Sequence, residues 1–336
     1  SALHRTADFL SRIRMAFVFC IFIAVPPHCA FSIALFFFFF QYDFTSEDIH
    51  CIILFIRGVI EMIQMIVMDM DGTLLTSDNR ISSRTKELLL RVQSQGVRLV
   101  LASGRSYCKL MEYAEELHMD AYGGYLLEVN GLILYDLASG KRHIRKQMGR
   151  SEMEELFTYF RQWDVEIMAQ FDDGLFDYNP ESVLKEKAEY RKKHKLSDDY
   201  PWTGGAFALL ADNRKGYPKI HYINTWEEID RSINKVSVAY HEDVMAEVSA
   251  QAKRDLQDRY WLGLTTPKWL ELMPLGITKG SGLTALAEML DIPMHDVMAF
   301  GDGENDIEML QAAGIGIAMG NAMPEVKACL LYTSPS

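Results

Sequence analysis

The feature that most constrains this chain is a series of short apolar segments, each followed by glycine or small polar residues. Between them, apolar side chains recur at helical spacing. Residues 85–92 carry one such face, and Gly96 ends that helix. Segments that are apolar throughout fit strands buried on both faces, and repeated strand–helix units predict a parallel sheet covered by helices on both sides. The predicted strands are Met65–Met70, Val97–Ala102, Tyr125–Val129, Asp296–Phe300 and Ile315–Ala318.

A second region, residues 148–264, follows a different pattern. Helical patterns, including one at residues 227–234, alternate here with strand-like segments, and all five tryptophans lie at or after Trp163. We predict an α+β cap domain inserted into the first domain. Residues 65–147 and 265–328 would then form one α/β core around a doubly wound parallel sheet.

The two ends of the chain differ in composition from the middle. Twelve of the 18 phenylalanines lie in residues 1–64, which hold two apolar runs of eleven residues, Met15–Val25 and Ala30–Phe40. A membrane-spanning helix needs about 20 apolar residues. We interpret residues 1–64 as a non-native or disordered apolar leader, with a signal peptide or membrane anchor as alternatives. Residues 329–336 read CLLYTSPS and resemble a translated sequencing adapter, so we interpret them as an artefactual tail.

The charge and the cysteines narrow the classes of function. The formal net charge is −12 and no basic run of the kind that phosphate binding requires occurs, so binding to nucleic acid through its phosphates is not expected. Only Cys108 lies between residues 65 and 328, which gives neither a disulfide framework nor a thiolate metal site. This pattern fits a reducing compartment, and we expect a cytoplasmic protein.

Polar residues gather where the predicted strands end. The candidates are Asp69 and Asp71 after the first strand, Ser103 and Gly104 after the second, Asp302, Asn305 and Asp306 after the fourth, and Lys279 at the start of the helix before that strand. Taken singly, each has a simpler interpretation as a turn, a helix cap or a solvated lysine. Because open α/β sheets bind ligands at the carboxyl ends of their strands, we expect the set to converge on one edge.

These residue types suit one kind of chemistry. Carboxylates packed together repel one another, so a cation is expected, and oxygen ligands with a substrate phosphate favour Mg²⁺. One carboxylate can attack phosphorus and form an aspartyl-phosphate, while another two residues away protonates the leaving oxygen and then activates water. A lysine and N–H groups at a helix start can neutralise the transferring phosphoryl group.

Together, the motifs resemble those of a known family. Asp-x-Asp-Gly-Thr-Leu at residues 69–74, Ser-Gly-Arg at 103–105, Lys279 and Gly-Asp-Gly-Glu-Asn-Asp at 301–306 look like the four motifs of the haloacid dehalogenase-like (HAD) hydrolases. The similarity spans residues 65–328 and is nearest to the Cof-type sugar-phosphatase branch (subclass IIB). That branch implies a Rossmann-like core with an α/β cap inserted between the second and third motifs.

The resemblance also implies a role for each candidate. Asp69 would be the nucleophile and a Mg²⁺ ligand, and Asp71 the general acid/base, with its backbone carbonyl on the metal. Ser103, the backbone around Gly104, and Asn305 would bind phosphate. Lys279 would pair with the phosphate and with Asp69. Asp302 would be a metal ligand, and Asp306 would support the metal or Lys279.

Two other functions stay open at this point. A receiver-like phosphoacceptor signalling module also uses aspartate, Mg²⁺ and lysine on an α/β sheet, although it needs neither Asp71 nor a cap. A membrane-anchored HAD relative requires the N-terminal apolar segment to be real. For the phosphatase, the expected partner is a small phosphorylated metabolite, either a sugar phosphate or a cofactor phosphate. The motifs do not define an oligomeric state.

Overall fold

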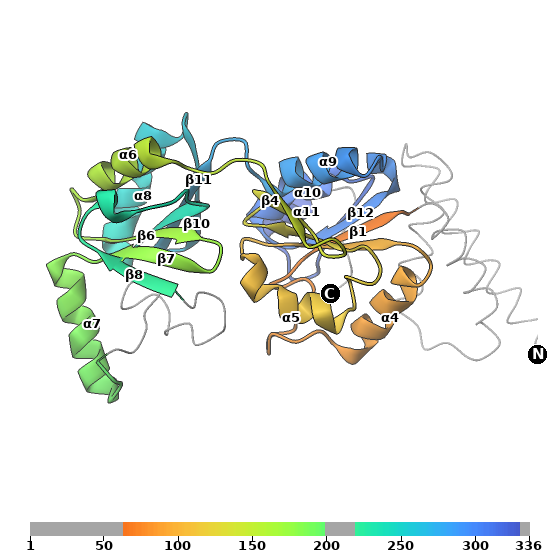
Figure 1. The fold of residues 1–336 in the computed structure, drawn as a ribbon, viewed down its shortest axis with the longest axis horizontal. Coiled ribbons are helices and arrows are strands. Elements are labelled where there is room, and N and C mark those ends of the chain that lie inside the picture. Colours follow the sequence, from red (N-terminus) through yellow and green to blue (C-terminus); the bar gives the residue numbers. More distant parts are fainter. Residues whose placement is uncertain (1–62, 199–218, 330–336) are drawn as a thin grey trace, which may run out of the picture.

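The computed structural model describes residues 63–198 and 219–329. Our interpretations of residues 1–64 and 329–336 therefore concern segments almost entirely outside the described residues. The described chain forms two β-sheet units that lie side by side and are joined by two connecting segments (Figure 1). No helix among the described residues has both the length and the apolar character needed to cross a membrane.

The first sheet has seven strands in the order β13-β12-β1-β2-β3-β4-β5. The neighbours from β13 to β3 pair in parallel, which confirms the α/β prediction for the centre of the sheet. The strands are β1 (Met65–Asp69), β2 (Arg98–Ala102), β3 (Tyr125–Glu128), β4 (Ile133–Asp136), β5 (Lys141–Ile144), β12 (Val297–Gly301) and β13 (Ile315–Ala318).

One edge of this sheet departs from a purely parallel arrangement. Strands β3, β4 and β5 pair antiparallel. Asn130 and Gly131 have φ values of 54° and 81°, which give the tight turn that reverses the chain after β3. Strand β5 is polar and partly exposed, so it lacks the apolar pattern that would reveal it in the sequence.

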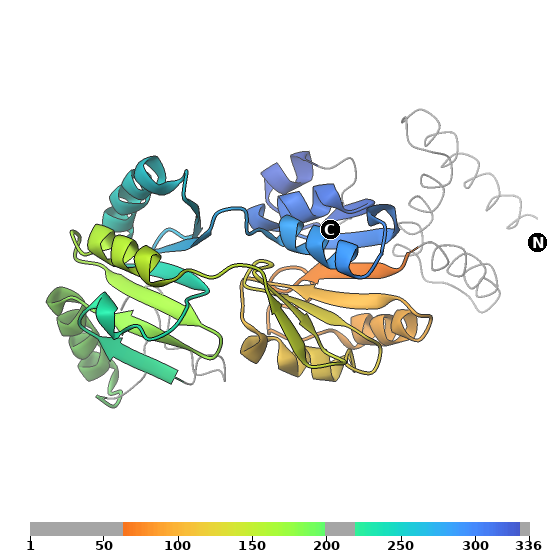
Figure 2. The same cartoon turned by 45° about the horizontal axis from the view of Figure 1, so that its top comes forward.

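Helices cover both faces of the first sheet (Figure 2). Leu89, from α4, packs on one face with Leu99 and Leu101 of β2. Leu283 and Leu286, from α9, belong to the cluster on the other face. The helices are α4 (Ser83–Gln93) and α5 (Met111–Glu116) on the first face, and α9 (Lys279–Met289), α10 (Ile307–Ala312) and α11 (Pro324–Ala328) on the second, with short 3₁₀ turns at η1 (Tyr107–Lys109), η3 (Met294–Asp296) and η4 (Glu304–Asp306).

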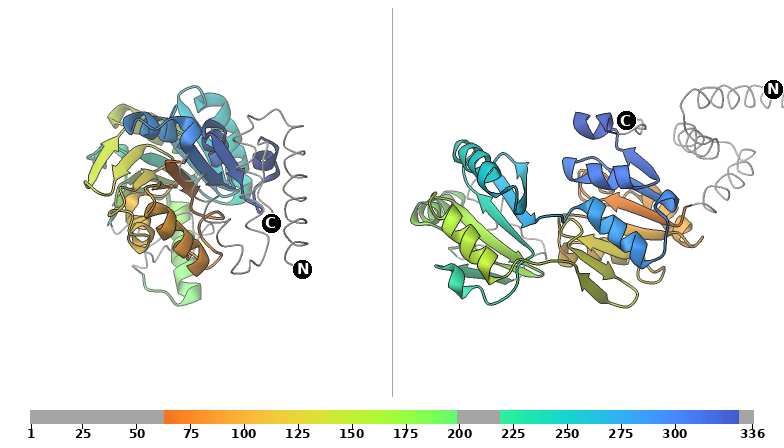
Figure 3. Two further views of the ribbon diagram at one scale, coloured as in Figure 1. Left: turned by 90° about the vertical axis from the view of Figure 1, so that its right-hand side faces the viewer. Right: turned by 90° about the horizontal axis from the view of Figure 1, so that it is seen from above.

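The second sheet has six strands in the order β10-β11-β9-β6-β7-β8. Helices α6 and α8 cover one of its faces through a large apolar cluster (Figure 3). The elements are α6 (Arg150–Phe160), β6 (Glu166–Phe171), β7 (Gly174–Tyr178), α7 (Glu181–His194), β8 (Lys219–Ile223), η2 (Trp226–Glu228), β9 (Lys235–Ala239), α8 (Glu242–Leu256), β10 (Tyr260–Thr266) and β11 (Trp269–Pro274).

Two expectations for this region need correction. The helix expected at residues 227–234 is only the short turn η2, because the backbone is extended at Ile229 and Ile233 exchanges backbone hydrogen bonds with Met148. The expected boundary between 264 and 265 falls inside β10, which forms an antiparallel hairpin with β11. We therefore propose that the inserted cap runs from about residue 148 to Pro274.

The cap contains a buried cluster of three charged side chains. Lys187 of α7 donates to Glu166 of β6 and lies 3.9 Å from Asp177 of β7, and all three side chains are at most 2% exposed. Burial raises the pKa of Glu166 well above its usual range and raises that of Asp177, while Lys187 opposes both shifts. One lysine thus compensates two carboxyl groups, which favours protonation of one of them.

Replacing this lysine should destabilise the cap in a pH-dependent way. We expect Lys187→Met to lower the free energy of unfolding by about 3–5 kcal/mol at neutral pH, since two buried carboxyl groups lose their cation. Because both carboxyl pKa values are raised in the folded chain, the loss should be smallest near pH 4 and should grow as the pH rises toward 7.5. Urea unfolding followed by tryptophan fluorescence measures it. Lys185→Met, on the exposed side of the same helix, is the control, and equal stability of the two variants at pH 7.5 would contradict the expectation.

Candidate active site

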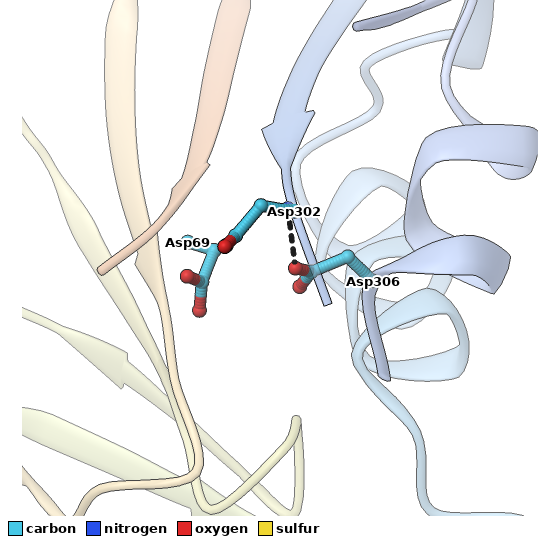
Figure 4. Close-up of side chains that lie close together, drawn as sticks. All are labelled: Asp69, Asp302 and Asp306. Atoms are coloured by element: carbon cyan, nitrogen blue, oxygen red, sulfur yellow. Dashed lines mark hydrogen bonds between the residues drawn. The ribbon is translucent and has the colours of Figure 1, made fainter. Parts of the chain in front are cut away.

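Two aspartates come together at the centre of the first sheet. Asp69 is the last residue of β1, and Asp302 follows β12, the neighbouring strand. Strands β2 and β12 lie on opposite sides of β1, so the strand order reverses here and opens a crevice at the carboxyl ends. Because Met68 pairs with Phe300 in parallel register, Asp302 lies only one residue beyond the level of Asp69. One oxygen of each lies within 4.8 Å of the other and of an Asp306 oxygen (Figure 4).

A buried lysine joins two of these carboxylates. Lys279, the first residue of α9, donates from Nζ to Asp69 Oδ1 at 2.5 Å and to Asp306 Oδ1 at 2.6 Å. Its side chain is 1% exposed, so water does not screen the pair. The helix begins here because Thr278 Oγ1 accepts the N–H of Ser281 at 3.1 Å.

A close backbone contact sets the position of this lysine. The turn at Gly131 touches the start of α9 so tightly that an added Cβ would lie 2.7 Å from Thr278 O and 2.9 Å from Gly282 Cα. The φ of Gly131 is 81°, which disfavours other residues for a second reason. The turn after β3 therefore limits where the start of α9, and with it Lys279, can lie.

Asp306 holds both Lys279 and the loop after β12. Its Oδ2 accepts the backbone N–H groups of Asp302 and Gly303, each at 3.0 Å, while its Oδ1 accepts from Lys279. Both oxygens are therefore engaged within the chain. Of the two roles expected for Asp306, this arrangement favours support of Lys279 over support of a metal ion.

Asp302 is oriented by two neutral groups. Its Oδ1 accepts from Thr73 Oγ1 and its Oδ2 from Asn321 Nδ2, both at 3.1 Å. Asn321 also donates to Gly72 O at 2.9 Å, which links the loop after β1 to the loop after β13. An added Cβ on Gly72 would lie 2.2 Å from the Asp302 carboxylate, so glycine is needed for the approach.

The Asp71 carboxylate lies apart from this group. Arg105 donates from Nε to Asp71 Oδ2 at 3.1 Å and from Nη2 to Asp71 Oδ1. The Asp71 side chain is 59% exposed, whereas that of Arg105 is 16% exposed. The structure thus pairs the expected acid/base with an arginine from the loop after β2.

Two of the expected phosphate-binding residues, Gly104 and Asn305, are linked through Asn130. Ser103 is buried, and its Oγ accepts the N–H of Arg105 at 3.2 Å. An added Cβ on Gly104 would lie 3.5 Å from Asn130 Oδ1, and that oxygen accepts from Asn305 Nδ2 at 3.2 Å. Asn130 therefore connects the loop after β2 to the loop after β12.

The electrostatics leave negative charge uncompensated. Burial raises the pKa of Asp69 to about 6 although Lys279 opposes the shift, and burial also raises the pKa of Asp302. Burial favours the neutral amine of Lys279, but Asp69 and Asp306 outweigh it and raise the pKa of the ammonium group. Three carboxylates face one cation, so the cluster has the charge and the oxygen donors to hold a metal ion.

Sequence reasoning did not assign roles to three residues that shape this site. Thr73 and Arg105 lie inside recognised motifs, and their position beside the assigned residues was the available signal. Asn321 lies in the segment after the last strand of the sheet, and its two contacts depend on how β13 packs beside β12.

Comparison with known proteins agrees with this geometry. Residues 66–336 match the family of haloacid dehalogenase-like hydrolases, and the chain belongs to that family. An HMP-PP phosphatase of Klebsiella pneumoniae is 29% identical over 268 residues, covering 80% of this chain and 88% of the relative. A haloacid dehalogenase-like hydrolase from Bacteroides thetaiotaomicron is 29% identical with a TM-score of 0.64, covering 81% of this chain and 93% of that one. A subclass IIB sugar phosphatase shares the fold at 20% identity, with a TM-score of 0.60 and coverage of 80% and 92%.

The contact between Gly131 and α9 gives a prediction with a matched control. Gly131→Ala and Gly140→Ala both place alanine at positive φ, which costs about 1–2 kcal/mol, but a Cβ at Gly140 meets nothing within 4 Å. The clash at Gly131 should add about 1–3 kcal/mol to the loss of unfolding free energy. Urea unfolding followed by circular dichroism compares the two. Equal losses would contradict a close contact that positions α9.

Proposed function

We propose that this chain is a Mg²⁺-dependent phosphatase that hydrolyses small phosphomonoesters through an aspartyl-phosphate on Asp69. The observation that carries the proposal is Asp69 held between the buried ammonium of Lys279 and the carboxylate of Asp302 at the crevice of the first sheet. Membership of a hydrolase family and the phosphatase relatives support it. We infer a small phosphorylated metabolite as substrate, and a cytoplasmic location from the cysteine pattern.

The residues present fit a magnesium ion. Asp69 and Asp302 offer carboxylate oxygens that lie within 4.8 Å of one another, and the Asp71 backbone carbonyl is a third candidate ligand. Mg²⁺ binds through one or two carboxylates and substrate phosphate, which matches this donor set. When bound, it would neutralise charge on the phosphoryl oxygens.

The side chains divide the reaction between them. Asp69 attacks phosphorus, and the bond from phosphorus to the leaving oxygen breaks while Asp71 gives that oxygen a proton. Asp71 then takes a proton from the water that attacks the phosphoryl group and frees Asp69. Because Arg105 holds Asp71 in this structure, Asp71 has to exchange that partner for the leaving oxygen.

The remaining groups bind the transferring phosphoryl group. Lys279 supplies positive charge next to the Asp69 oxygen, and Ser103 Oγ, the Gly104 backbone and the Asn305 amide supply hydrogen bonds. A second sheet of six strands has no role in a receiver-like signalling module, whereas it can exclude water from a hydrolase site.

The proposal predicts complete dependence on one carboxylate. In the full chain, Asp69→Asn should lower turnover of p-nitrophenyl phosphate by at least about 10³-fold, since an amide cannot form the intermediate. Removal of Mg²⁺ from the unaltered chain with a chelator should have a similar effect. Asp258→Asn, at an exposed position of the cap, is the control. Activity of Asp69→Asn within tenfold of the control variant would overturn the proposal.

A further inference from the structure

The cap sheet presents a polar strip on the face opposite to α6 and α8. Along β6, Ile167 and Ala169 pack in the apolar cluster beneath those helices. Gln170 alternates to the other face, where its Nε2 donates to Ser237 Oγ of β9 at 2.7 Å. Lys235 of β9 lies two residues before Ser237 on the same face, and Glu271 of β11 lies opposite Ser237 in the register.

Two side chains of this strip form an ion pair at the core. Lys235 Nζ lies 2.5 Å from Glu271 Oε1 and 3.4 Å from the carbonyl oxygen of Gly104. The indole N–H of Trp269 donates to the same Glu271 oxygen at 3.2 Å. Both charged side chains are 8% exposed, so this pair lies between the cap and the loop after β2.

A leaving group has to extend toward this pair. The parallel strands of the core run toward the cap (Figure 2), and Asp69 lies at the end of β1. The leaving oxygen stands roughly in line with the attacking one, on the far side of phosphorus. A phosphoryl group on Asp69 therefore directs its leaving group away from the core sheet, past Gly104 and toward the strip that carries Lys235.

The charges at this interface favour a neutral leaving group. Lys235 is matched by Glu271, and Lys219 by Asp173. Arg142 faces two carboxylates, Glu128 in the core and Asp172 in the cap. The same face of the cap carries the Glu166, Asp177 and Lys187 cluster, which has more carboxyl groups than cations. A second phosphate needs surplus positive charge, which these pairs do not supply.

We propose that Lys235 and Glu271 determine specificity by hydrogen bonding the hydroxyl groups of a neutral leaving group and by disfavouring one that carries a second phosphate. This inference rests on the proposed phosphatase function. An ammonium donor and a carboxylate acceptor side by side can bind adjacent hydroxyls, each of which both donates and accepts. Glu271 repels an additional phosphate at the same place.

Steady-state kinetics of the full chain with Mg²⁺ test the inference. The substrates are a three- to six-carbon series of polyol and sugar monophosphates, fructose 1,6-bisphosphate against fructose 6-phosphate, and p-nitrophenyl phosphate. In the unaltered chain, we expect kcat/KM for fructose 6-phosphate to exceed that for fructose 1,6-bisphosphate by at least about tenfold. Lys235→Met should lower kcat/KM for the best hydroxylated substrate by about tenfold or more. The loss for p-nitrophenyl phosphate should be smaller, because its leaving group has no hydroxyls. Glu271→Gln should lower the ratio of kcat/KM for fructose 6-phosphate to kcat/KM for fructose 1,6-bisphosphate by about fivefold or more.

The controls separate this inference from the proposed function. Lys253→Met, on the exposed side of α8, should leave the kcat/KM ratios between substrates unchanged. Circular dichroism checks that each variant folds. Equal losses for hydroxylated and aryl substrates in both variants, or a wild type that prefers the bisphosphate or hydrolyses only the aryl phosphate, would overturn the inference alone. A wild type without Mg²⁺-dependent hydrolysis of p-nitrophenyl phosphate would overturn the proposed function and this inference with it.

Discussion

One buried ammonium group joins the parts of this molecule that carry the candidate chemistry. Lys279 links Asp69 at the end of β1 to Asp306 in the turn after β12, and Asp306 in turn holds the N–H groups of Asp302 and Gly303. An ammonium group at this depth is stable only with such partners, and the carboxylates are equally costly without a cation. The interaction therefore explains why three elements from distant parts of the sequence converge.

The surrounding backbone is shaped to make this interaction possible. Gly131 lets the start of α9 approach the turn after β3, and Gly72 lets Asp302 approach the loop after β1. The parallel pairing of β1 with β12 brings Asp69 and Asp302 to within one residue of the same level. Three carboxylates around one lysine leave a negative excess, which under the proposed function a magnesium ion and a substrate phosphate would share. Close backbone approach, burial and charge thus act at the same place.

The predictability of each part follows from where its determinants lie. Strands β1 and β12 and the helix start at Lys279 carry local signals, so their convergence follows from the rules for parallel sheets. Strand β5 is polar and is defined by its hairpin pairing with β4. Strand β11 is defined by its pairing with β10 and β9, so its sequence alone does not separate it from the return to the core. The contacts of Asn321 with Gly72 and Asp302 and of Lys235 with Gly104 join residues from different strand ends or from different sheets. No periodicity in the sequence records such contacts.

Trapping the covalent intermediate would test the central claim, that Asp69 accepts the phosphoryl group. The full chain is mixed with Mg²⁺ and p-nitrophenyl phosphate, quenched rapidly in acid and analysed by peptide mass spectrometry. An aryl leaving group needs no proton from Asp71, so Asp71→Asn should still form the intermediate but release it slowly. We predict one phosphoryl group on Asp69, more abundant in Asp71→Asn than in the unaltered chain. A phosphoryl group on another residue, or none during steady turnover in either chain, would contradict the account.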